Sequence, residues 1–332
     1  MGPTSLIVYA LVKSGLPPDD PAIGKAVEYL RDLPFNKVYS VGLLIMALDA
    51  LGGNENDAWI QGAATWLEDN INPKFDYWGY PKGTPDLSNT QYAVLGLRAA
   101  THMGYPVREQ TWLGVIRYCA IVMEHKGPAG VVSLIRRGEA IPDEARAHLQ
   151  NLRKVARVAG FRYSTLSRHD HVDGALTCAA ITCLVVARHQ LRRLESHKLN
   201  GKLKAEIDDM LATGWAWLQA SWRMDRHPRL AGGRWYYYFL YSLERAAVLD
   251  AVKRVGGSDW YFEGAMQLLA RQTRRPAQDG EAKPEPGDPK EESPDGAWNR
   301  QGAHETAPTC FALLFLKRGT APLSAPITST GK

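Results

Sequence analysis

The feature that most constrains this chain is an alternation between two kinds of helical segment. One kind is apolar on nearly every face, begins at a polar or hydroxyl-bearing residue and often stops at Gly or Asn. The other kind carries apolar residues at helical spacing with charges between them. We predict apolar helices over 4–14, 39–48, 86–102, 173–189, 235–255 and 306–316, and amphipathic helices over 21–33, 57–70, 107–123, 203–222 and 259–272.

This alternation predicts the architecture. A helix that is apolar on all sides has to be surrounded by protein, whereas an amphipathic helix faces water on one side. We therefore expect an all-α fold, an α/α toroid formed by residues 1–332 as one domain, with an inner ring of six parallel helices and an outer ring of five or six antiparallel helices. One outer helix is unaccounted for and is expected to precede Met1; the alternative is that the ring closes without it.

Two stretches interrupt the alternation. Residues 126–172 form an insertion in which we expect a polar, basic helix at about 142–158. Residues 273–294 are rich in Pro, Glu, Asp, Lys and Gly and have almost no apolar side chain, which predicts a disordered acidic loop. The helical pattern resumes after each stretch, so neither marks a domain boundary.

The composition argues against several classes of protein. The net charge is +5 and the basic residues are scattered among acidic ones, whereas a nucleic-acid surface usually needs a concentrated basic stripe. The sequence has no segment of 18 consecutive apolar residues, so we predict no transmembrane segment. The N-terminus has no basic secretory signal, and the localisation is left open. The four cysteines lie in apolar helical patterns and are expected to be buried free thiols.

The helix that begins at Trp235 has the most conspicuous composition. Tyr237 and Tyr241 are four residues apart, as are Tyr238 and Ser242, so two hydroxyl-bearing stripes lie on adjacent helix faces. In a toroid cavity such rings would suit an isoprenoid chain or a carbocation. The alternative is packing between the two layers, and some of the rings must pack because consecutive aromatic residues cannot all point one way.

Three turns carry a family resemblance. They are Gln272 followed, beyond the acidic loop, by Asp295-Gly296-Ala297-Trp298; Trp217-Leu218-Gln219 with Gly233-Arg234-Trp235; and Trp66-Leu67 with Trp78-Gly79-Tyr80. They resemble the Gln-Trp repeat of squalene–hopene and oxidosqualene cyclases, in which a Gly-x-Trp turn joins an outer helix to the next inner helix. The chain is similar to the terpenoid cyclase and protein prenyltransferase superfamily of α/α toroids, and in particular to bacterial prenyltransferase and squalene-oxidase repeat proteins.

The catalytic motifs that this resemblance implies are missing. Class II terpene cyclases protonate their substrate with an Asp-x-Asp-Asp motif, which this sequence lacks. Protein prenyltransferase β-subunits hold zinc with an Asp and a Cys two residues apart and a later His; here Ala175 replaces the Cys after Asp173, and His304 is the candidate for the His. We therefore predict no metal and no other cofactor, with zinc as the alternative. A helix N-cap is the other role open to Asp173.

The candidate site residues gather at the starts of the predicted inner helices. In a toroid these N-termini converge at one end, where their dipoles favour an anion. His169-Asp170-His171 is the densest titratable group, and a His–Asp pair makes a general base, although a solvated loop is the alternative. The predicted catalytic residues are His169, Asp170, His171, Asp173 and His304. The predicted ligand-binding residues are Asp86, Asn89, Arg234, Trp235, Tyr237, Tyr238, Tyr241 and Glu305.

Three functions fit these patterns. The first is an isoprenoid-handling enzyme or binder with an apolar small molecule in the toroid, which the resemblance and the aromatic helix favour. The second is a non-catalytic scaffold with a protein partner at its rim. The third is a polysaccharide-active enzyme, which would need paired carboxylates in a cleft.

Overall fold

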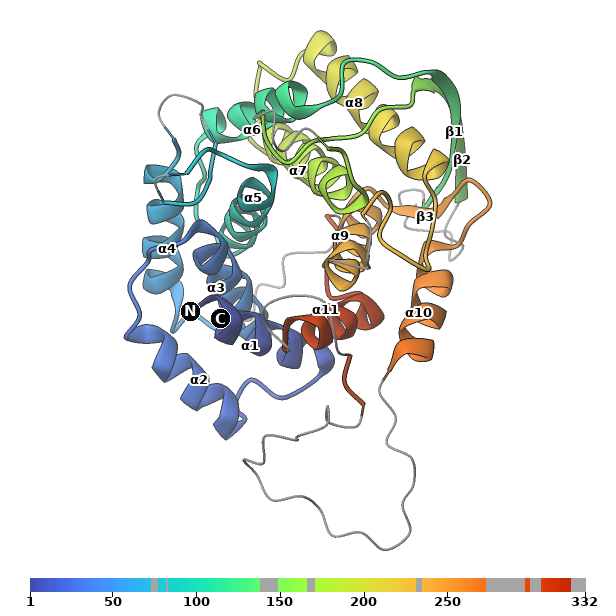
Figure 1. Cartoon of the computed structure of the whole chain (residues 1–332). Helices are drawn as coiled ribbons and strands as arrows, with labels where there is room; N and C mark the ends of the chain where they lie inside the picture. Colours follow the sequence, from blue (N-terminus) through green and yellow to red (C-terminus); the bar gives the residue numbers. More distant parts are fainter. Residues whose placement is uncertain are drawn as a thin grey trace, which may run out of the picture.

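Six helices follow one another around a closed circuit in the computed structural model, which describes residues 1–72, 77–81, 83–137, 149–165, 171–230, 235–272, 296–298 and 306–323 (Figure 1). They are α1 (Gly2–Ser14), α3 (Val38–Leu51), α5 (Leu87–His102), α7 (Gly174–Arg193), α9 (Tyr236–Leu249) and α11 (Thr306–Lys317). Each packs on the next in this order, and α11 packs back on α1. The protein is therefore mostly helical.

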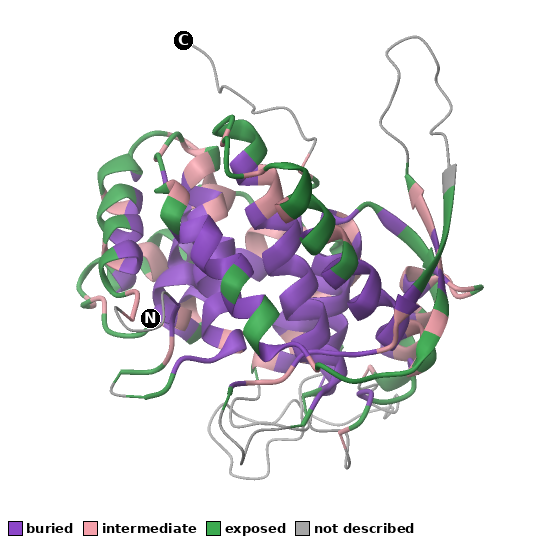
Figure 2. Cartoon of the chain, turned by 90° about the horizontal axis from the view of Figure 1, so that it is seen from above, coloured by how far each residue is buried: buried purple, intermediate pink, exposed green. Residues whose placement is uncertain are grey.

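Five further helices lie outside this circuit (Figure 1). They are α2 (Pro21–Arg31), α4 (Asp57–Asp69), α6 (Glu109–Val122), α8 (Gly201–Ala220) and α10 (Trp260–Arg271). The buried residues of α10 are Trp260, Gly264 and Leu268, which share one helix face, whereas α7 buries every residue from 174 to 187. The burial pattern in Figure 2 follows this division between enclosed and outward-facing helices.

The contact between α3 and α5 depends on two glycines. A Cβ atom on Gly42 would lie 2.3 Å from the carbonyl oxygen of Tyr92, and one on Gly96 would lie 2.7 Å from the Cα of Gly42. Backbones that approach this closely leave no room for a side chain. This close packing places Gln91 and Tyr92 of α5 beside the first turns of α3.

A three-stranded antiparallel sheet corrects the all-α prediction. The strands β1 (Ala129–Arg137), β2 (Leu149–Arg157) and β3 (Val252–Val255) pair in the order β2-β1-β3, and the sheet packs against α8. The side chain of Gln219 at the end of α8 holds β1: its Oε1 accepts from the Ser133 backbone at 2.8 Å, and its Nε2 donates to the Val131 carbonyl at 2.9 Å.

One predicted helix and one predicted helix end are wrong because of this sheet. The polar helix expected at about 142–158 is a strand over 149–157, where pairing with β1 outweighs the helical spacing of its few apolar residues; residues 138–148 lie outside the described chain. The aromatic helix ends at Leu249 rather than at Val255, since Ala251 has a φ of 55° and the following four residues join the sheet. The acidic loop expected at 273–294 also lies outside the described residues.

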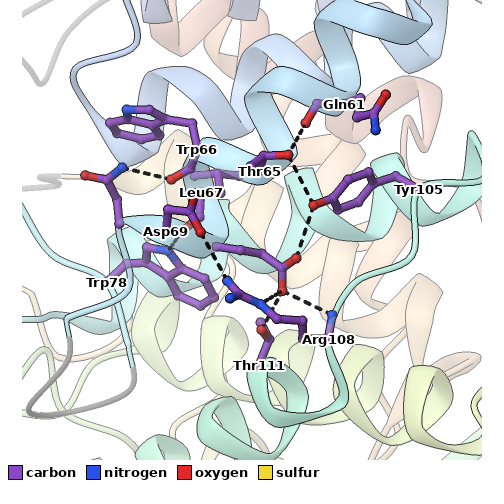
Figure 3. A network of polar contacts seen from close by, with 11 residues as sticks. Gln61, Thr65, Trp66, Leu67, Asp69, Trp78, Tyr105, Arg108 and Thr111 are labelled. Carbon is purple, nitrogen blue, oxygen red and sulfur yellow. Dashed lines mark hydrogen bonds and ion pairs between the residues drawn. The ribbon is translucent and has the colours of Figure 1, made fainter.

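Two tryptophans connect an outer helix to the segment before the next circuit helix in the same way. The indole Nε1 of Trp78 donates to the Leu67 carbonyl of α4 at 2.8 Å (Figure 3), and that of Trp298 donates to the Leu268 carbonyl of α10 at 2.8 Å. Trp235 differs from both, because its side chain is 51% exposed. Around the first of these turns, the buried carboxylate of Glu68 accepts from the backbone and side chain of Arg108 and from the Thr111 hydroxyl, which joins α4 to α6.

Among the described helices, α7 alone is long and apolar enough to cross a membrane by length and composition. In this structure 89% of that apolar window is buried inside the protein.

Candidate functional site

Two buried aspartates cap neighbouring helices of the circuit. Asp86 precedes α5 and accepts from the backbone N–H of Asn89 at 2.8 Å, and Asp173 precedes α7 and accepts from that of Leu176 at 2.9 Å. Both are N-caps in extended conformation, so each carboxylate satisfies a backbone donor that the helix leaves open. The two helix starts lie close together, since the N–H of Leu87 donates to the carbonyl of Tyr163 and Arg162 pairs with Val172.

Asp173 lies between two histidines. Its Oδ2 is 3.9 Å from Nε2 of His171, whose side chain is 54% exposed, and its Oδ1 is 3.7 Å from Nε2 of His227, which is fully buried. His227 Nε2 accepts from the Ala175 backbone N–H at 3.2 Å, so this nitrogen carries no proton in the structure. Burial raises the pKa of Asp173 to about 7 and lowers that of His227 to about 4. This buried acid has an exposed histidine beside it.

The surroundings of Asp86 are more polar. Its Oδ2 accepts from the side-chain amide of Asn89 at 2.8 Å, and it also hydrogen-bonds with Tyr163. Burial raises the pKa of this carboxyl to about 6. The rise is limited, because these hydrogen bonds stabilise the charged form and offset part of the desolvation. Both oxygens of Asp86 are therefore engaged in holding the helix start.

Aromatic side chains surround this end of the circuit. Tyr80 is 52% exposed and Trp235 is 51% exposed, and Tyr238 is partly buried. The rings of Trp235 and Tyr238 meet edge to face with centroids 6.5 Å apart, and the Tyr238 hydroxyl donates to Oε1 of Gln91 at 2.9 Å. Burial raises the pKa of Tyr163, and the nearby groups of Asp86, Tyr80 and Tyr238 raise it further, so the three phenols lie near one another. We call Tyr80, Trp235 and Tyr238 the aromatic mouth.

The other two tyrosines predicted to bind ligand lie deeper. Tyr241 is fully buried, with its ring stacked on Phe311 at 5.2 Å. Tyr237 is 7% exposed and contacts the ring of Tyr236. Both rings pack in the core, and their role in ligand binding stays a prediction.

Five of the predicted site residues lie outside the described part of the chain: His169, Asp170, Arg234, His304 and Glu305. The structure brings Asp86, Asn89, His171, Asp173, Trp235 and Tyr238 to one end of the circuit. It also places His227 beside Asp173, a residue that the sequence reasoning missed because it lies in a loop with no recognisable spacing. Within the described residues, no group of three or more His, Cys, Asp and Glu side chains is arranged to hold a metal ion.

Two pockets border the described helices. The larger is about 570 Å³ and is lined by Phe35, Trp66 and Tyr80 together with Asn36, Val38 and residues 69–72, 79, 81 and 83. The smaller is about 250 Å³ and lies between α4 and residues 103–106. Tyr80 belongs both to the larger pocket and to the aromatic mouth, so the pocket adjoins the mouth.

Comparison with known proteins gives one match. Part of the chain is similar to the probable squalene–hopene cyclase of Sinorhizobium fredii, with 29% identity over 107 residues. The match covers 26% of this chain and 16% of that cyclase. No family model matches the chain, and no solved structure matches it. The similarity hints at a terpenoid-cyclase-like superfamily, and the mostly helical fold is consistent with that.

Proposed function

We propose that this protein is a terpenoid-cyclase-like α/α toroid that binds an apolar, isoprenoid-type ligand at the aromatic mouth. The closed circuit of α1, α3, α5, α7, α9 and α11 supports the toroid. The matching indole contacts of Trp78 and Trp298, and the bond from Gln272 Nε2 to the Gly296 carbonyl at 2.9 Å, support the Gln-Trp repeat. The proposal that an apolar ligand binds here rests on one observation: exposed aromatic rings gather beside two buried carboxyl groups.

The aromatic mouth has the chemistry that an isoprenoid requires. Tyr80 and Trp235 each leave about half of their surface open to solvent, so both rings are accessible to a ligand. Apolar chains gain roughly 25 cal/mol for each Å² that they remove from water against such rings. The adjoining pocket of about 570 Å³ is within the usual size range of small-molecule sites.

Asp173 would act as the acid if the protein is an enzyme. A carboxyl with a pKa of about 7 is protonated in a large fraction of molecules at neutral pH, and it therefore holds a proton that it can donate. One oxygen of Asp173 caps α7, while the other faces His171, whose exposed ring can return a proton from solvent. Of the remaining predicted catalytic residues, His169, Asp170 and His304 keep this role as hypotheses.

Binding is tested with squalene and farnesol as probes. Native mass spectrometry and tryptophan fluorescence should detect a complex with at least one of them, and Trp235→Ala or Tyr80→Ala should weaken it about tenfold, since each removes a large apolar contact. Tyr29→Ala is the matched control, because Tyr29 is 55% exposed on α2, away from the mouth. If neither squalene nor farnesol forms a complex, the proposal of an isoprenoid-type ligand is refuted.

Catalysis is tested separately by incubating the protein with squalene and analysing the products by gas chromatography and mass spectrometry. Asp173→Asn keeps the cap acceptor and removes the acid, so it should abolish product while leaving probe binding unchanged. A wild-type complex that gives no product would restrict the function to binding.

A second candidate, a protein-binding scaffold, is favoured by one surface. Outer helix α10 exposes Phe262, Met266 and Leu269 by 64%, 50% and 47%, and their spacing places them along one face. If this face binds a partner or a second copy, the double change Phe262→Ser and Met266→Ser should remove concentration-dependent association in sedimentation velocity. A wild-type protein that stays monomeric at all concentrations would leave self-association without support.

A further inference from the structure

The middle of the helix circuit holds a buried arginine for which the described residues provide no acidic partner. Arg245 of α9 is fully buried, and its Nη2 lies 3.4 Å from Oε1 of Gln91 and 3.2 Å from the Ser242 hydroxyl. Since α7 separates α5 from α9 in the circuit, the contact with Gln91 spans the interior. In the part of the chain that the structure describes, no carboxylate lies within 4.0 Å of this guanidinium, whereas Arg188 pairs with Asp208 and Asp250.

The neighbouring carboxyl does not fill this role. Glu244 is also fully buried, but its Oε1 accepts from the Thr320 backbone at 3.1 Å and its Oε2 from the Thr320 hydroxyl at 2.7 Å. Consecutive helix residues project about 100° apart, so Glu244 is directed to the segment after α11 while Arg245 is directed to the interior. Burial raises the pKa of Glu244 to about 7, which further reduces the negative charge that it contributes.

Aromatic faces compensate for only part of the buried charge. The guanidinium carbon lies 3.8 Å from the ring centre of Tyr241 and 5.3 Å from that of Tyr92. Desolvated cation–π contacts stabilise a buried guanidinium by less than an unpaired ion inside a protein costs. The difference calls for a negative group or for strong acceptors.

Several donors around the guanidinium also have no hydrogen-bonded acceptor among the residues that the structure describes. They are Nε and Nη1 of Arg245, Nε2 of Gln91 and the hydroxyl of Tyr241. The orientation of the Gln91 amide is determined by its oxygen, which accepts from both Tyr238 and Arg245, so its N–H groups remain available. Each buried donor left without a partner destabilises the folded protein, because it has given up its hydrogen bonds to water. The cluster therefore has an excess of donors together with a positive charge.

We propose that Arg245, Gln91 and Tyr241 form a binding site for a compact anion, of the size of a halide or a single carboxylate. Such an anion would neutralise the guanidinium and accept from the donors around it. Tyr238 belongs to the aromatic mouth and its hydroxyl bonds to Gln91, so the anion site adjoins the mouth. The anion is either a free ion or the carboxylate end of a ligand whose apolar part lies in the mouth. The site itself does not depend on the proposed isoprenoid function.

The first test compares thermal stability at constant ionic strength while sodium gluconate, whose anion is too large for a buried site, is replaced by sodium chloride or sodium acetate. An ion that binds only the folded protein raises Tm with the logarithm of its concentration above Kd, by about 2–3 °C at tenfold excess over Kd for a chain of this size. Arg245→Met should remove this rise, and Gln91→Met should reduce it in case the first variant does not fold. Arg188→Met is the control: it removes a paired arginine and should keep the wild-type rise.

The second test identifies the occupant. In crystals grown with sodium bromide, anomalous scattering should show bromide in contact with the Arg245 guanidinium. Geranic acid and geraniol distinguish the two sources, because a site for a ligand carboxylate should bind the acid more than tenfold tighter than the alcohol, and a site for free ions should show no such preference. Water alone beside Arg245, with a Tm that does not depend on the anion, would overturn the proposal.

Discussion

The starts of α5 and α7 use the same backbone arrangement in different surroundings. In each, a buried aspartate caps the helix, and a threonine four residues later donates its hydroxyl to the carbonyl of that aspartate at 2.8 Å: Thr90 to Asp86 and Thr177 to Asp173. At α5 the second carboxylate oxygen is bound by Asn89, whereas at α7 it faces the exposed His171. The comparison separates a carboxylate whose two oxygens are both engaged at the helix start from one with an oxygen directed at an exposed histidine.

The difference also appears in the energetic cost of ionisation. Asp86 has a pKa of about 6 and Asp173 a pKa of about 7, although both are buried, because Asp86 receives more hydrogen bonds. A protein that only needed an N-cap at α7 would do as well with Asn, which caps equally well and carries no charge. The carboxyl of Asp173 therefore costs stability above its pKa, which is consistent with the proton-donor role proposed for it.

The largest expected effect comes from Asp173→Asn. An Asp whose folded pKa lies above its unfolded value of 3.8 stabilises the protein only while it is protonated, so this stability is present in acid and is lost as the pH rises to about 7. At about 1.4 kcal/mol for each pH unit, the loss is about 4 kcal/mol. The Asn variant should therefore be more stable than the wild type at pH 8 and similar to it at pH 4, as measured by urea unfolding. A variant less stable at both values would contradict this assignment.

How far the sequence predicts this region can be judged from the same residues. The helical pattern with its polar start predicts both helix beginnings, and the structure has Asp86 and Asp173 as N-caps. Local spacing carries this information, because a cap and its helix are contiguous in the chain. The neighbours of Asp173 could not be predicted in this way. His227 comes from a loop 54 residues further on, and no local pattern connects the two.

The sheet and the surroundings of the buried Arg245 could not be predicted from local sequence patterns for a similar reason. Residues 149–157 form a strand only because β1 pairs with them, and pairing partners are not encoded in the spacing of one segment. Arg245 did leave a signal, since a Glu-Arg pair inside an otherwise apolar helix is unusual, but its contact with Gln91 depends on how α5 and α9 face each other. The sequence can therefore predict which helices are enclosed, but not which side chains meet between them.

His227→Gln should show the opposite pH signature to that of Asp173→Asn. A histidine whose folded pKa of about 4 lies below its unfolded value of 6.5 destabilises the protein as the pH falls between these values, by about 3 kcal/mol in total. Gln retains an acceptor for the Ala175 N–H and does not titrate. The variant should therefore lose less stability than the wild type between pH 7 and pH 4. Parallel curves for the two proteins would mean that His227 is not buried in its neutral form.

Asp86→Asn repeats the first experiment at the helix with the more polar surroundings. Its pKa of about 6 restricts the pH effect to the range between about 4 and 6, with a total of about 3 kcal/mol. The gain at pH 8 should be smaller than for Asp173, because the Asn variant also loses charge-assisted bonds from Asn89 and Tyr163. Urea unfolding of both variants across pH 4–8 shows which substitution gains more stability. A larger gain for Asp86→Asn than for Asp173→Asn would contradict the assignment of Asp86 as the carboxylate with the stronger hydrogen bonds.

The smallest expected effect distinguishes the two threonines. The Thr177 hydroxyl also accepts from the backbone N–H of Phe161 at 3.3 Å, whereas the second contact of Thr90 is a long one of 3.5 Å to the Trp78 carbonyl. Thr177→Val would leave a buried N–H without its acceptor, which costs about 1–2 kcal/mol, and Thr90→Val would remove only a secondary bond, at about 0.5 kcal/mol. Since valine matches threonine in shape, packing changes little in either variant. Equal losses in urea unfolding would show that the hydroxyls serve only their own aspartate carbonyls, and that α7 is not held to residue 161 through Thr177.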